Sequence, residues 1–507
     1  MKRVSELITT DTARNFADGD VITIKAGTGV GKSYWVKNIL YLIAKENNEK
    51  ILFLIHRVNC VDQFKDEIIK DKKTDVIDIR TYQKLESLYN NQKKIFDFSE
   101  YKYIVCDEFH YFMSDAAYNK TTDISLNLIL TQDDKVKIFM SATGDYMKGY
   151  INEIKKIKTI DYELPIKFDF IKNLTFFNKD ETLEKFIEEA IRKGDKSIFF
   201  IQSATKAYNL YKKYKKYCLF NCGKSDKHYK YVDVEKIDNM LKNERFDKLI
   251  LITTTCMDAG VNINDEEVKH IVCDVKDLGV LIQCIGRKRI QSENDKIYLY
   301  IKTITNKQLG GMKRQLNTKI DKAKYLKTHT VKEYIEQYPR QNDYNNIVYS
   351  DTVEEDDKST HKVNELMYFK CLVDGATIDT MLAYKQYGYC KYLANLLGFI
   401  DDEGYFNYRL IDEDYKKKTL EEYLNNAIGK KLYKNDQHEL AKTANIKRNG
   451  KLLKSAEALN SCFKEERIPF IIDNNDKNID WTRKLEDGTE NPYRGKKYWM
   501  IYKLVFS

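Results

Sequence analysis

The sequence lacks the features that mark membrane-bound or secreted proteins. No run of apolar residues is long enough to cross a bilayer, and residues 1–7 lack the apolar core of a signal peptide. Ten cysteines occur without any Cys-x-x-Cys pair, and the neighbouring Cys218, Cys222 and His228 are too few for a zinc site. These absences exclude the membrane-spanning and disulfide-scaffold classes. They predict a cytoplasmic protein of a reducing compartment, with no membrane partner.

Length and charge set the next limits. With 507 residues, the chain is long enough for three or four domains with separate cores. It carries 86 Lys and Arg against 77 Asp and Glu, and most of this excess lies in residues 416–507, which hold 20 basic and 13 acidic side chains. A basic terminal domain indicates a polyanionic partner, although an ordinary solvated surface has the same composition.

A glycine-rich segment near the N-terminus carries the clearest signal. Residues 21–24 predict a short buried strand, and a helical pattern begins at Lys32 and Ser33. Glycines between a strand and a helix let backbone N–H groups turn inward, where they bind polyphosphate together with the helix N-terminus. We therefore predict ATP and Mg²⁺ as cofactors, with Lys32 on the β- and γ-phosphates and Ser33 on the metal. The loop comprises Ala26, Gly27, Thr28, Gly29, Val30, Gly31, Lys32 and Ser33.

Two carboxylates follow an apolar strand farther along the chain. Residues 103–106 predict a buried strand that ends in Asp107 and Glu108, with His110 two positions later. Because the carboxyl ends of parallel strands share one edge of a sheet, we expect these side chains beside the phosphate loop. Asp107 would hold Mg²⁺ through water, and Glu108 would orient and activate an attacking water.

Apolar runs that predict strands alternate with helical patterns over two regions of the chain. Such alternation is typical of parallel α/β sheets, whose chemistry lies at the C-terminal ends of the strands. We therefore predict an α/β fold with two tandem parallel-sheet domains. The runs are residues 51–55, 76–79, 103–106 and 136–140 in the first region, and residues 197–201, 248–255 and 270–274 in the second.

Several segments, in order, resemble the motifs of superfamily 2 helicases of the DExH type. The resemblance covers residues 26–289 and implies that the two sheet domains are RecA-like. In its last segment the final arginine comes one position earlier than in the commoner pattern, as in some viral and phage members such as herpesvirus origin-binding proteins. This indicates a phage, viral or mobile-element type, in a bacterial or phage-infected cytoplasm. The segments are residues 26–33 (motif I), Asp107-Glu108-x-His110 (motif II), Ser141-Ala142-Thr143 (motif III), 253–263 (motif V) and 283–289 (motif VI).

The resemblance implies an ATP hydrolase that nucleic acid stimulates. Arg287 is the first choice for the arginine finger, and the shifted register leaves the role of Arg289 open. DNA is favoured over RNA, and replication or nuclease proteins are expected as partners. The implied catalytic residues are Lys32, Glu108, His110, Gln283, Arg287 and Arg289. On weaker matches, nucleic-acid contacts are implied at Arg57, Thr81, Ser203, Thr254 and Thr255.

Composition and motifs together predict four parts of the chain. Residues 1–160 form the ATP-binding domain, 161–305 the second RecA-like domain, 306–415 a helical accessory region, and 416–507 a basic α+β module. Within the last part, three predicted helices (420–433, 436–445 and 454–464) precede two predicted strands (469–472 and 498–502). This order favours a winged-helix-like module, although a plain α+β cap on the motor explains it equally well.

Three functions fit these patterns. The first is a helicase or translocase, on DNA or alternatively on RNA. The second is a site-specific replication initiator in which the C-terminal module chooses the site and ATP gates assembly. The third is a restriction translocase, but the sequence has no nuclease motif, so cutting would need a partner chain.

Overall fold

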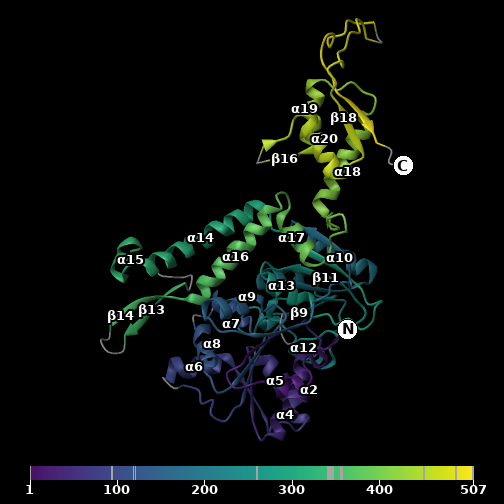
Figure 1. Ribbon diagram of the computed structural model, residues 1–507. Helices are drawn as coiled ribbons and strands as arrows, with labels where there is room; N and C mark the ends of the chain where they lie inside the picture. Colours follow the sequence, from purple (N-terminus) through teal and green to yellow (C-terminus); the bar gives the residue numbers. More distant parts are fainter. Residues whose placement is uncertain are drawn as a thin grey trace. The chain divides into compact units, whose positions relative to one another are not determined.

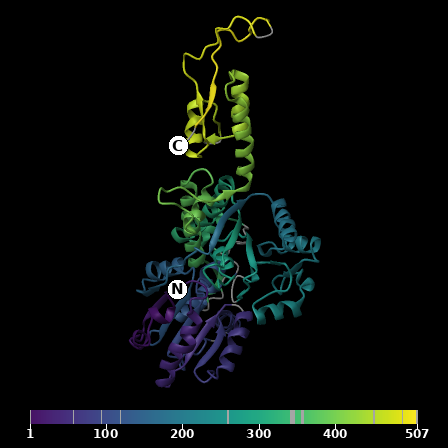
Figure 2. The same ribbon diagram turned by 90° about the vertical axis from the view of Figure 1, so that its right-hand side faces the viewer.

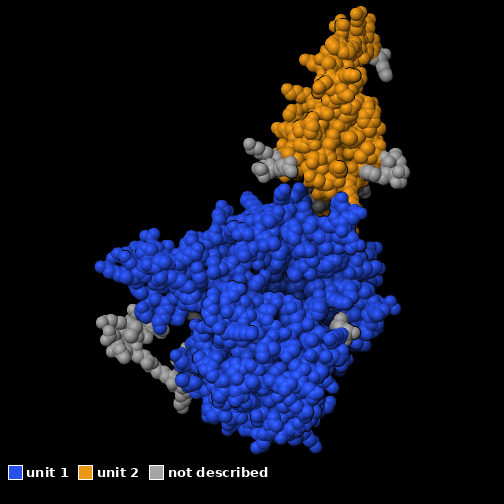
Figure 3. Space-filling model, in the orientation of Figure 1, with its two compact units in different colours: residues 1–408 blue, residues 409–507 orange. Residues whose placement is uncertain are grey.

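The computed structural model describes residues 2–56, 58–92, 95–117, 119, 121–257, 261–339, 347–353, 358–448, 451–485 and 488–504. It divides into two compact units, residues 1–408 and 409–507 (Figure 3). Each unit is described separately. Among the described residues, no helix combines the length and the apolar character that crossing a bilayer would require.

The first domain of unit 1 contains a parallel sheet in the order β3-β2-β4-β5-β1-β6. Its strand β2 is buried at every position, as a continuous apolar run predicts for a strand covered on both faces. The strands are β1 (Val21–Lys25), β2 (Ile51–Ile55), β3 (Ile77–Thr81), β4 (Tyr103–Asp107), β5 (Val136–Ser141) and β6 (Ile160–Glu163). The helices are α1 (Val4–Leu7), α2 (Thr10–Arg14), α3 (Lys32–Trp35), η1 (Val36–Leu40), α4 (Tyr41–Glu46), α5 (Val58–Lys70), α6 (Tyr82–Gln92), α7 (Tyr111–Ser114), η2 (Asp115–Ala117), α8 (Thr122–Leu130), α9 (Asp145–Gly149) and η3 (Tyr150–Ile154).

The strand order brings three loops of this domain together. Strand β5 lies between β1 and β4, and all three run in the same direction. The phosphate loop after β1, the carboxylates at the end of β4 and Ser141 at the end of β5 therefore emerge at the same edge of the sheet.

The second domain of unit 1 repeats the parallel α/β pattern. Its strands are ordered β7-β12-β11-β8-β10-β9 and pair in parallel. The predicted fold class, two tandem RecA-like parallel-sheet domains followed by mainly helical and α+β elements, is confirmed. The strands are β7 (Ile171–Phe177), β8 (Lys196–Ile201), β9 (Cys218–Asn221), β10 (Ile250–Thr253), β11 (Val268–Asp274) and β12 (Ile297–Lys302). The helices are α10 (Glu181–Lys193), α11 (Ala204–Lys213), η4 (Tyr229–Tyr231), α12 (Val234–Asn243), η5 (Thr255–Met257) and α13 (Leu278–Ile285).

Residues 306–383 form an arm that follows the second domain in the chain but packs on the first (Figure 1). Buried Ile320 and Met367 of the arm share one apolar core with Phe112 and Tyr150 of the first domain. The next helix, α17, returns to the second domain, where Thr303 and Cys390 are in contact. The elements of this region are α14 (Asn306–Thr328), α15 (Val331–Gln337), β13 (Val348–Val353), β14 (Lys358–Val363), α16 (Glu365–Ala383) and α17 (Gly388–Leu396).

One prediction for this region is wrong. The acidic, polar composition of residues 351–359 predicts a linker or loop, but the described residues of this segment belong to β13 and β14, which pair antiparallel. Backbone hydrogen bonds hold this ribbon, and buried Val348 joins it to the core that the arm shares with the first domain. A local charge pattern does not reveal either contact.

Unit 2 contains three helices and an antiparallel strand pair around their own core. The sequence predicts Asp436 and Ser455 as helix caps. Ser455 is confirmed, since its hydroxyl accepts a hydrogen bond from the N–H of Ala458 at 3.2 Å, but Asp436 lies inside α19, whose N-cap is Tyr433. The predicted domain boundary at residues 415 and 416 falls inside helix α18. The elements are β15 (Arg409–Leu410), α18 (Ile411–Ala427), α19 (Lys434–Ala444), β16 (Lys447–Arg448), β17 (Lys451–Leu452), α20 (Ala456–Glu465), β18 (Phe470–Asp473) and β19 (Met500–Lys503).

Candidate functional site

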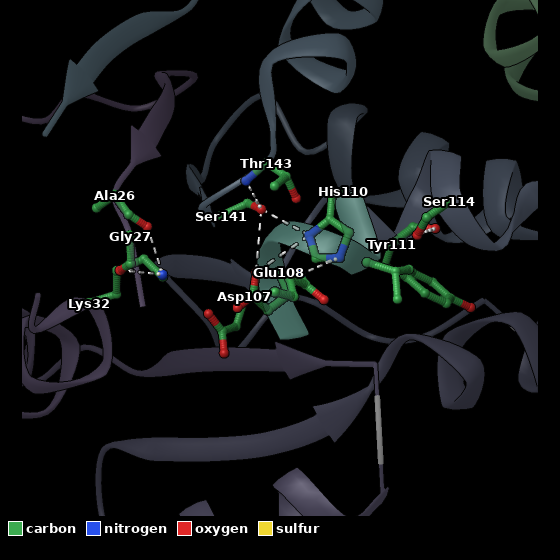
Figure 4. Close-up of polar contacts among 12 residues, drawn as sticks. Ala26, Gly27, Lys32, Asp107, Glu108, His110, Tyr111, Ser114, Ser141 and Thr143 are labelled. Atoms are coloured by element: carbon green, nitrogen blue, oxygen red, sulfur yellow. Dashed lines mark hydrogen bonds and ion pairs between the residues drawn. The ribbon is translucent and has the colours of Figure 1, made fainter. Parts of the chain in front are cut away.

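The phosphate loop has the geometry that its sequence predicts. Gly29 and Gly31 have φ angles of 86° and 91°, which favour glycine, and Gly31 caps the helix that starts at Lys32. The Lys32 side chain is only 8% exposed, and its Nζ donates hydrogen bonds to the carbonyls of Ala26 at 2.9 Å and Gly27 at 3.2 Å (Figure 4). The loop thus folds around the lysine that the sequence assigns to the phosphates.

The two carboxylates follow β4 and face this loop. Glu108 has a φ of 49°, a left-handed conformation that is costly for a residue with a side chain and that clusters at functional sites. The hydroxyl of Tyr82 donates a hydrogen bond to the carbonyl of Asp107 at 2.9 Å and fixes the end of the strand. Tyr82 directly follows Thr81, and the sequence alone gave no sign of this contact.

A chain of hydrogen bonds reaches Glu108 from the second domain. The Ser141 hydroxyl donates to Glu108 Oε2 at 3.3 Å, so it must accept from His110 Nδ1 at 2.8 Å and from the N–H of Thr143 at 3.0 Å (Figure 4). His110 Nε2 lies 2.9 Å from the Gln283 amide nitrogen and accepts from it in the tautomer that carries its proton on Nδ1. His110 Nδ1 is also 3.4 Å from Glu108 Oε2, so His110 and Ser141 together connect Gln283 to Glu108.

The two adjacent carboxyl groups differ in how readily they ionise. Burial raises the pKa of Asp107 to about 7, and the neighbouring Glu108 carboxylate adds to the rise. Burial also disfavours the charged form of Glu108, but Lys32, His110 and Arg287 outweigh it and hold the pKa of Glu108 below its usual range. Glu108 is therefore ionised at neutral pH and acts as a hydrogen-bond acceptor.

Arg287 and Arg289 approach the same place from the second domain. Arg287 is 3% exposed, and its Nε donates to the Gln283 carbonyl at 3.1 Å, while its buried Nη2 has no hydrogen-bond partner among the described residues. Arg289 lies on the phosphate loop, because a Cβ added to Gly29 would be 3.0 Å from its Nη1. Burial, together with Arg287, lowers the pKa of Arg289 to about 10, so the Arg289 guanidinium stays charged at neutral pH.

The two domains touch directly at this site. The Thr28 hydroxyl donates to the Gly286 carbonyl at 3.1 Å, and a Cβ added to Gly286 would lie 2.4 Å from the same hydroxyl. A side chain at position 286 would displace the Thr28 hydroxyl and break its hydrogen bond to the carbonyl of that residue. The glycine of motif VI therefore sets how closely the arginines approach the phosphate loop.

Sequence reasoning missed the residues that hold the two arginines. Asn262 Oδ1 accepts from Arg289 Nε at 2.8 Å and also from Nη2. Lys288 and Asp295 form a buried ion pair, and Lys288 Nζ also donates to the Arg289 carbonyl at 3.0 Å. Asn262 lies in the segment that resembles motif V, and this resemblance was the sequence signal that could have identified it as a site residue. The partner of Lys288 is seven residues away and carries no motif.

The predicted nucleic-acid residues lie at strand ends, away from these contacts. Thr81 is the last residue of β3 and accepts from the N–H of Lys84 at 3.1 Å, and Ser203 caps α11 by accepting from the N–H of Lys206 at 3.3 Å. Thr254 is buried, and Thr255 begins η5 after β10. Arg57 lies outside the described residues. The assignment of all five to nucleic acid stays a prediction.

The residues present fit a nucleoside triphosphate and a magnesium ion. The glycine turns and the helix start of the loop supply N–H donors, and the partnerless Nη2 of Arg287 is a buried donor on the facing domain. Ser33 and Asp107 supply the oxygen ligands that Mg²⁺ prefers, at the start of α3 and the end of β4.

No protein-family model and no curated protein matches the sequence. Among solved structures, S. cerevisiae Dbp5 bound to RNA and ADP BeF3 has a TM-score of 0.45 and 17% identity, over 59% of this chain and 83% of Dbp5. DEAD-box helicase Mss116 bound to ssRNA and UDP-BeF has a TM-score of 0.46 and 16% identity, over 61% and 71%. The DUF1998 helicase MrfA bound to DNA and AMPPNP has 0.41 and 15%, over 56% and 46%.

Of these three structures, two are of proteins named as helicases, one a DEAD-box helicase and one a DUF1998 helicase. At these identities the likeness concerns the fold, and none of them supports the predicted phage or viral type. The function proposed below therefore rests on the residues of this chain.

Proposed function

We propose that the protein is an ATP-dependent nucleic-acid helicase or translocase that hydrolyses ATP between its two sheet domains. The observation that carries the proposal is the hydrogen-bond chain from Gln283 through His110 and Ser141 to Glu108. It joins a residue of the second domain to the carboxylate that would position the attacking water. Hydrolysis and the relative position of the domains are thereby connected, which is what a motor requires.

The phosphate loop and its two metal-binding residues would hold the nucleotide. Lys32 would exchange its bonds to the Ala26 and Gly27 carbonyls for phosphate oxygens, and Ser33 and Asp107 would hold a magnesium ion. ATP supplies the phosphoanhydride bond whose hydrolysis releases the free energy. Coordination of a divalent cation favours the ionised form of Asp107, whose pKa burial otherwise raises to about 7.

Glu108 and the arginines would divide the chemical work. Glu108, ionised and held by Ser141, accepts a hydrogen bond from the attacking water and orients it. Arg287 directs its partnerless Nη2 at the charge that develops in the transition state. Arg289 lies against Gly29 and supports the same charge from the loop side. Both act only while Gly286 and Thr28 remain in contact.

The proposal extends to the type of nucleic acid and to the residues that contact it. The DExH pattern and the Gln-x-x-Gly-Arg-x-Arg ending favour DNA over RNA, in the replication or repair of a phage or mobile element. Arg57, Thr81, Ser203, Thr254 and Thr255 are the proposed contacts within the motor.

An ATPase assay on the full chain tests this function. We expect single-stranded nucleic acid to stimulate turnover, and the comparison of single-stranded DNA, duplex DNA and RNA identifies the substrate. Lys32→Ala should weaken nucleotide binding, because it removes the cation from the phosphates. Glu108→Gln should retain binding and lower turnover about 10²- to 10⁴-fold. Near-normal turnover in Glu108→Gln would contradict the assignment.

Unit 2 supports the site-specific initiator as a second candidate. Between α18 and α19, Ile428 and Leu432 make isolated backbone bridges of opposite sense to Ile501 and Trp499. The helices α18, α19 and α20 with the final strand pair β18 and β19 are the elements that favour a winged-helix-like module, with the short pair β16 and β17 between α19 and α20. If unit 2 selects a site, deletion of residues 409–507 removes sequence preference and keeps basal ATPase activity. The absence of any preference in the full chain would leave the general motor.

A further inference from the structure

The loop between β18 and β19 in unit 2 is an ordered hairpin. Its backbone pairs beyond the two strands, from Asp480 N–H to the Lys496 carbonyl at 3.0 Å and from Asn491 N–H to the Arg483 carbonyl at 3.0 Å. Figure 2 shows this segment extending beyond the helices of unit 2. We refer to residues 478–485 and 488–498 as the hairpin.

Two buried polar side chains hold the base and the middle of the hairpin. Asp480 accepts from the Tyr433 hydroxyl at 2.5 Å, from Lys431 Nζ at 3.1 Å and from the Thr482 N–H at 2.9 Å. Asn491 donates to the Thr482 carbonyl at 3.0 Å and accepts from the Tyr493 N–H at 3.0 Å. The hairpin is therefore a fixed platform.

Trp481 lies on the hairpin with its side chain exposed to solvent. Its side chain is 69% exposed, whereas Trp35 and Trp499, the other two tryptophans, are 0% and 9% exposed. Asp480 points inward, so in an extended chain the next side chain points away from the core. Among the described residues, no ring and no cation lies against the indole. Both faces of a large aromatic ring are left to solvent, on a backbone that is otherwise well anchored.

Cations accompany the exposed ring. Arg483, Lys484, Arg494 and Lys496 are exposed, and none of them has an ion pair among the described residues. The acidic groups at the base are already engaged, Asp480 as above and Asp476 with Lys497 at 2.6 Å. Among the described residues of the hairpin, the remaining carboxylate is Glu490, which lies opposite Lys484 in a backbone bridge. A polyanion is therefore attracted to the middle of the hairpin.

We propose that the hairpin binds single-stranded nucleic acid, with an unpaired base stacked on Trp481 and phosphates on the four cations. Stacking on an aromatic platform flanked by cations is the way proteins bind single strands. A duplex does not offer a free base face to the indole. The centre of a protein–protein interface is depleted of charge, and the charged residues around Trp481 are unlike such a centre. This site lies outside the ATPase residues and goes beyond the function proposed above.

Tryptophan emission of the full chain tests this site directly. Trp35 and Trp499 are buried, so we expect quenching on titration with oligothymidylate or oligouridylate to report Trp481. Trp481→Phe should abolish the quenching and keep most of the affinity, whereas Trp481→Ala should weaken binding about tenfold. Tighter binding of oligothymidylate identifies DNA as the preferred strand, and tighter binding of oligouridylate identifies RNA.

Two controls make the result decisive. Tyr502→Ala removes another exposed aromatic of unit 2 outside the hairpin and should change neither emission nor affinity. Basal ATPase should be unchanged in Trp481→Ala, so a failure of this proposal is distinguishable from a failure of the motor proposal. Unchanged emission with both polymers, or equal quenching by a blunt duplex, overturns the single-strand site.

Discussion

The candidate sites of the two units differ in how far solvent reaches their functional side chains. In unit 1, Lys32, Gln283 and Arg287 are almost fully buried, and each is held by hydrogen bonds from a neighbouring element. In unit 2, Trp481 and the cations around it are exposed on an anchored backbone. Charge stabilisation in a transition state needs fixed charged groups that are shielded from water. Reversible binding of a long polyanion instead needs cations that solvent can reach. Substitutions in the two units should therefore differ in size and in salt dependence.

The largest expected effect is on the chemical step in unit 1. Arg287→Ala should lower kcat about a thousandfold and leave ATP affinity nearly unchanged, because an arginine finger acts mainly on the transition state. Single-turnover hydrolysis with a separate nucleotide titration measures the two quantities. Arg289→Ala is the matched variant in the same loop. A large loss for Arg289 and none for Arg287 would reverse the assignment of the finger.

The next prediction compares a buried ion pair with an exposed one. Asp295→Asn should lower stability by about 3–5 kcal/mol, because it leaves Lys288 charged and buried without its partner. Thermal unfolding followed by circular dichroism measures the loss. Asp476→Asn in unit 2 breaks the exposed pair with Lys497 and should leave the melting curve unchanged. Equal losses in the two variants would contradict the comparison.

A smaller effect is expected from the hydrogen-bond chain between the domains. Gln283→Leu should lower kcat about a hundredfold, because His110 and Ser141 then lose the bond that aligns them on Glu108. Nucleotide affinity should hold, since Gln283 contacts neither the loop nor the metal residues. A rise in KM with normal kcat would show that the chain serves binding instead.

The smallest effect is expected in unit 2 and depends on salt. Lys496→Ala should reduce the log–log salt slope of nucleic-acid binding by about 0.7 to 0.9, which is the loss of one phosphate contact. Lys497→Ala should reduce it less, because Lys497 is already paired with Asp476. Fluorescence anisotropy over a range of salt concentrations measures both slopes, and identical slopes in the two variants would refute the distinction.

Local signals predicted the parts of the site that one short segment determines. Strand, glycines and Lys32 lie within one stretch of chain, as do the strand and its terminal carboxylates Asp107 and Glu108, and the sheet places both stretches at one edge. The contacts that Ser141, Asn262 and Lys288 make were not predictable, since each depends on side chains brought together by the fold. The pattern of residues 312–338 predicts a charged helical segment, but it cannot show that apolar residues within it, such as Ile320, pack on the first domain.

The position of the arm limits how unit 1 can open. Its chain leaves the second domain, packs on the first, and returns through α17 to the second. The first domain is thus attached twice, by the connection between β6 and β7 and by the arm. Two bodies joined at one point can swivel about any axis, but bodies joined at two points rotate only about the line between them. Any separation of Gly286 from Thr28 is then a rotation of one domain against the other about a fixed axis. A different movement would require the arm to detach first from Phe112 and Tyr150.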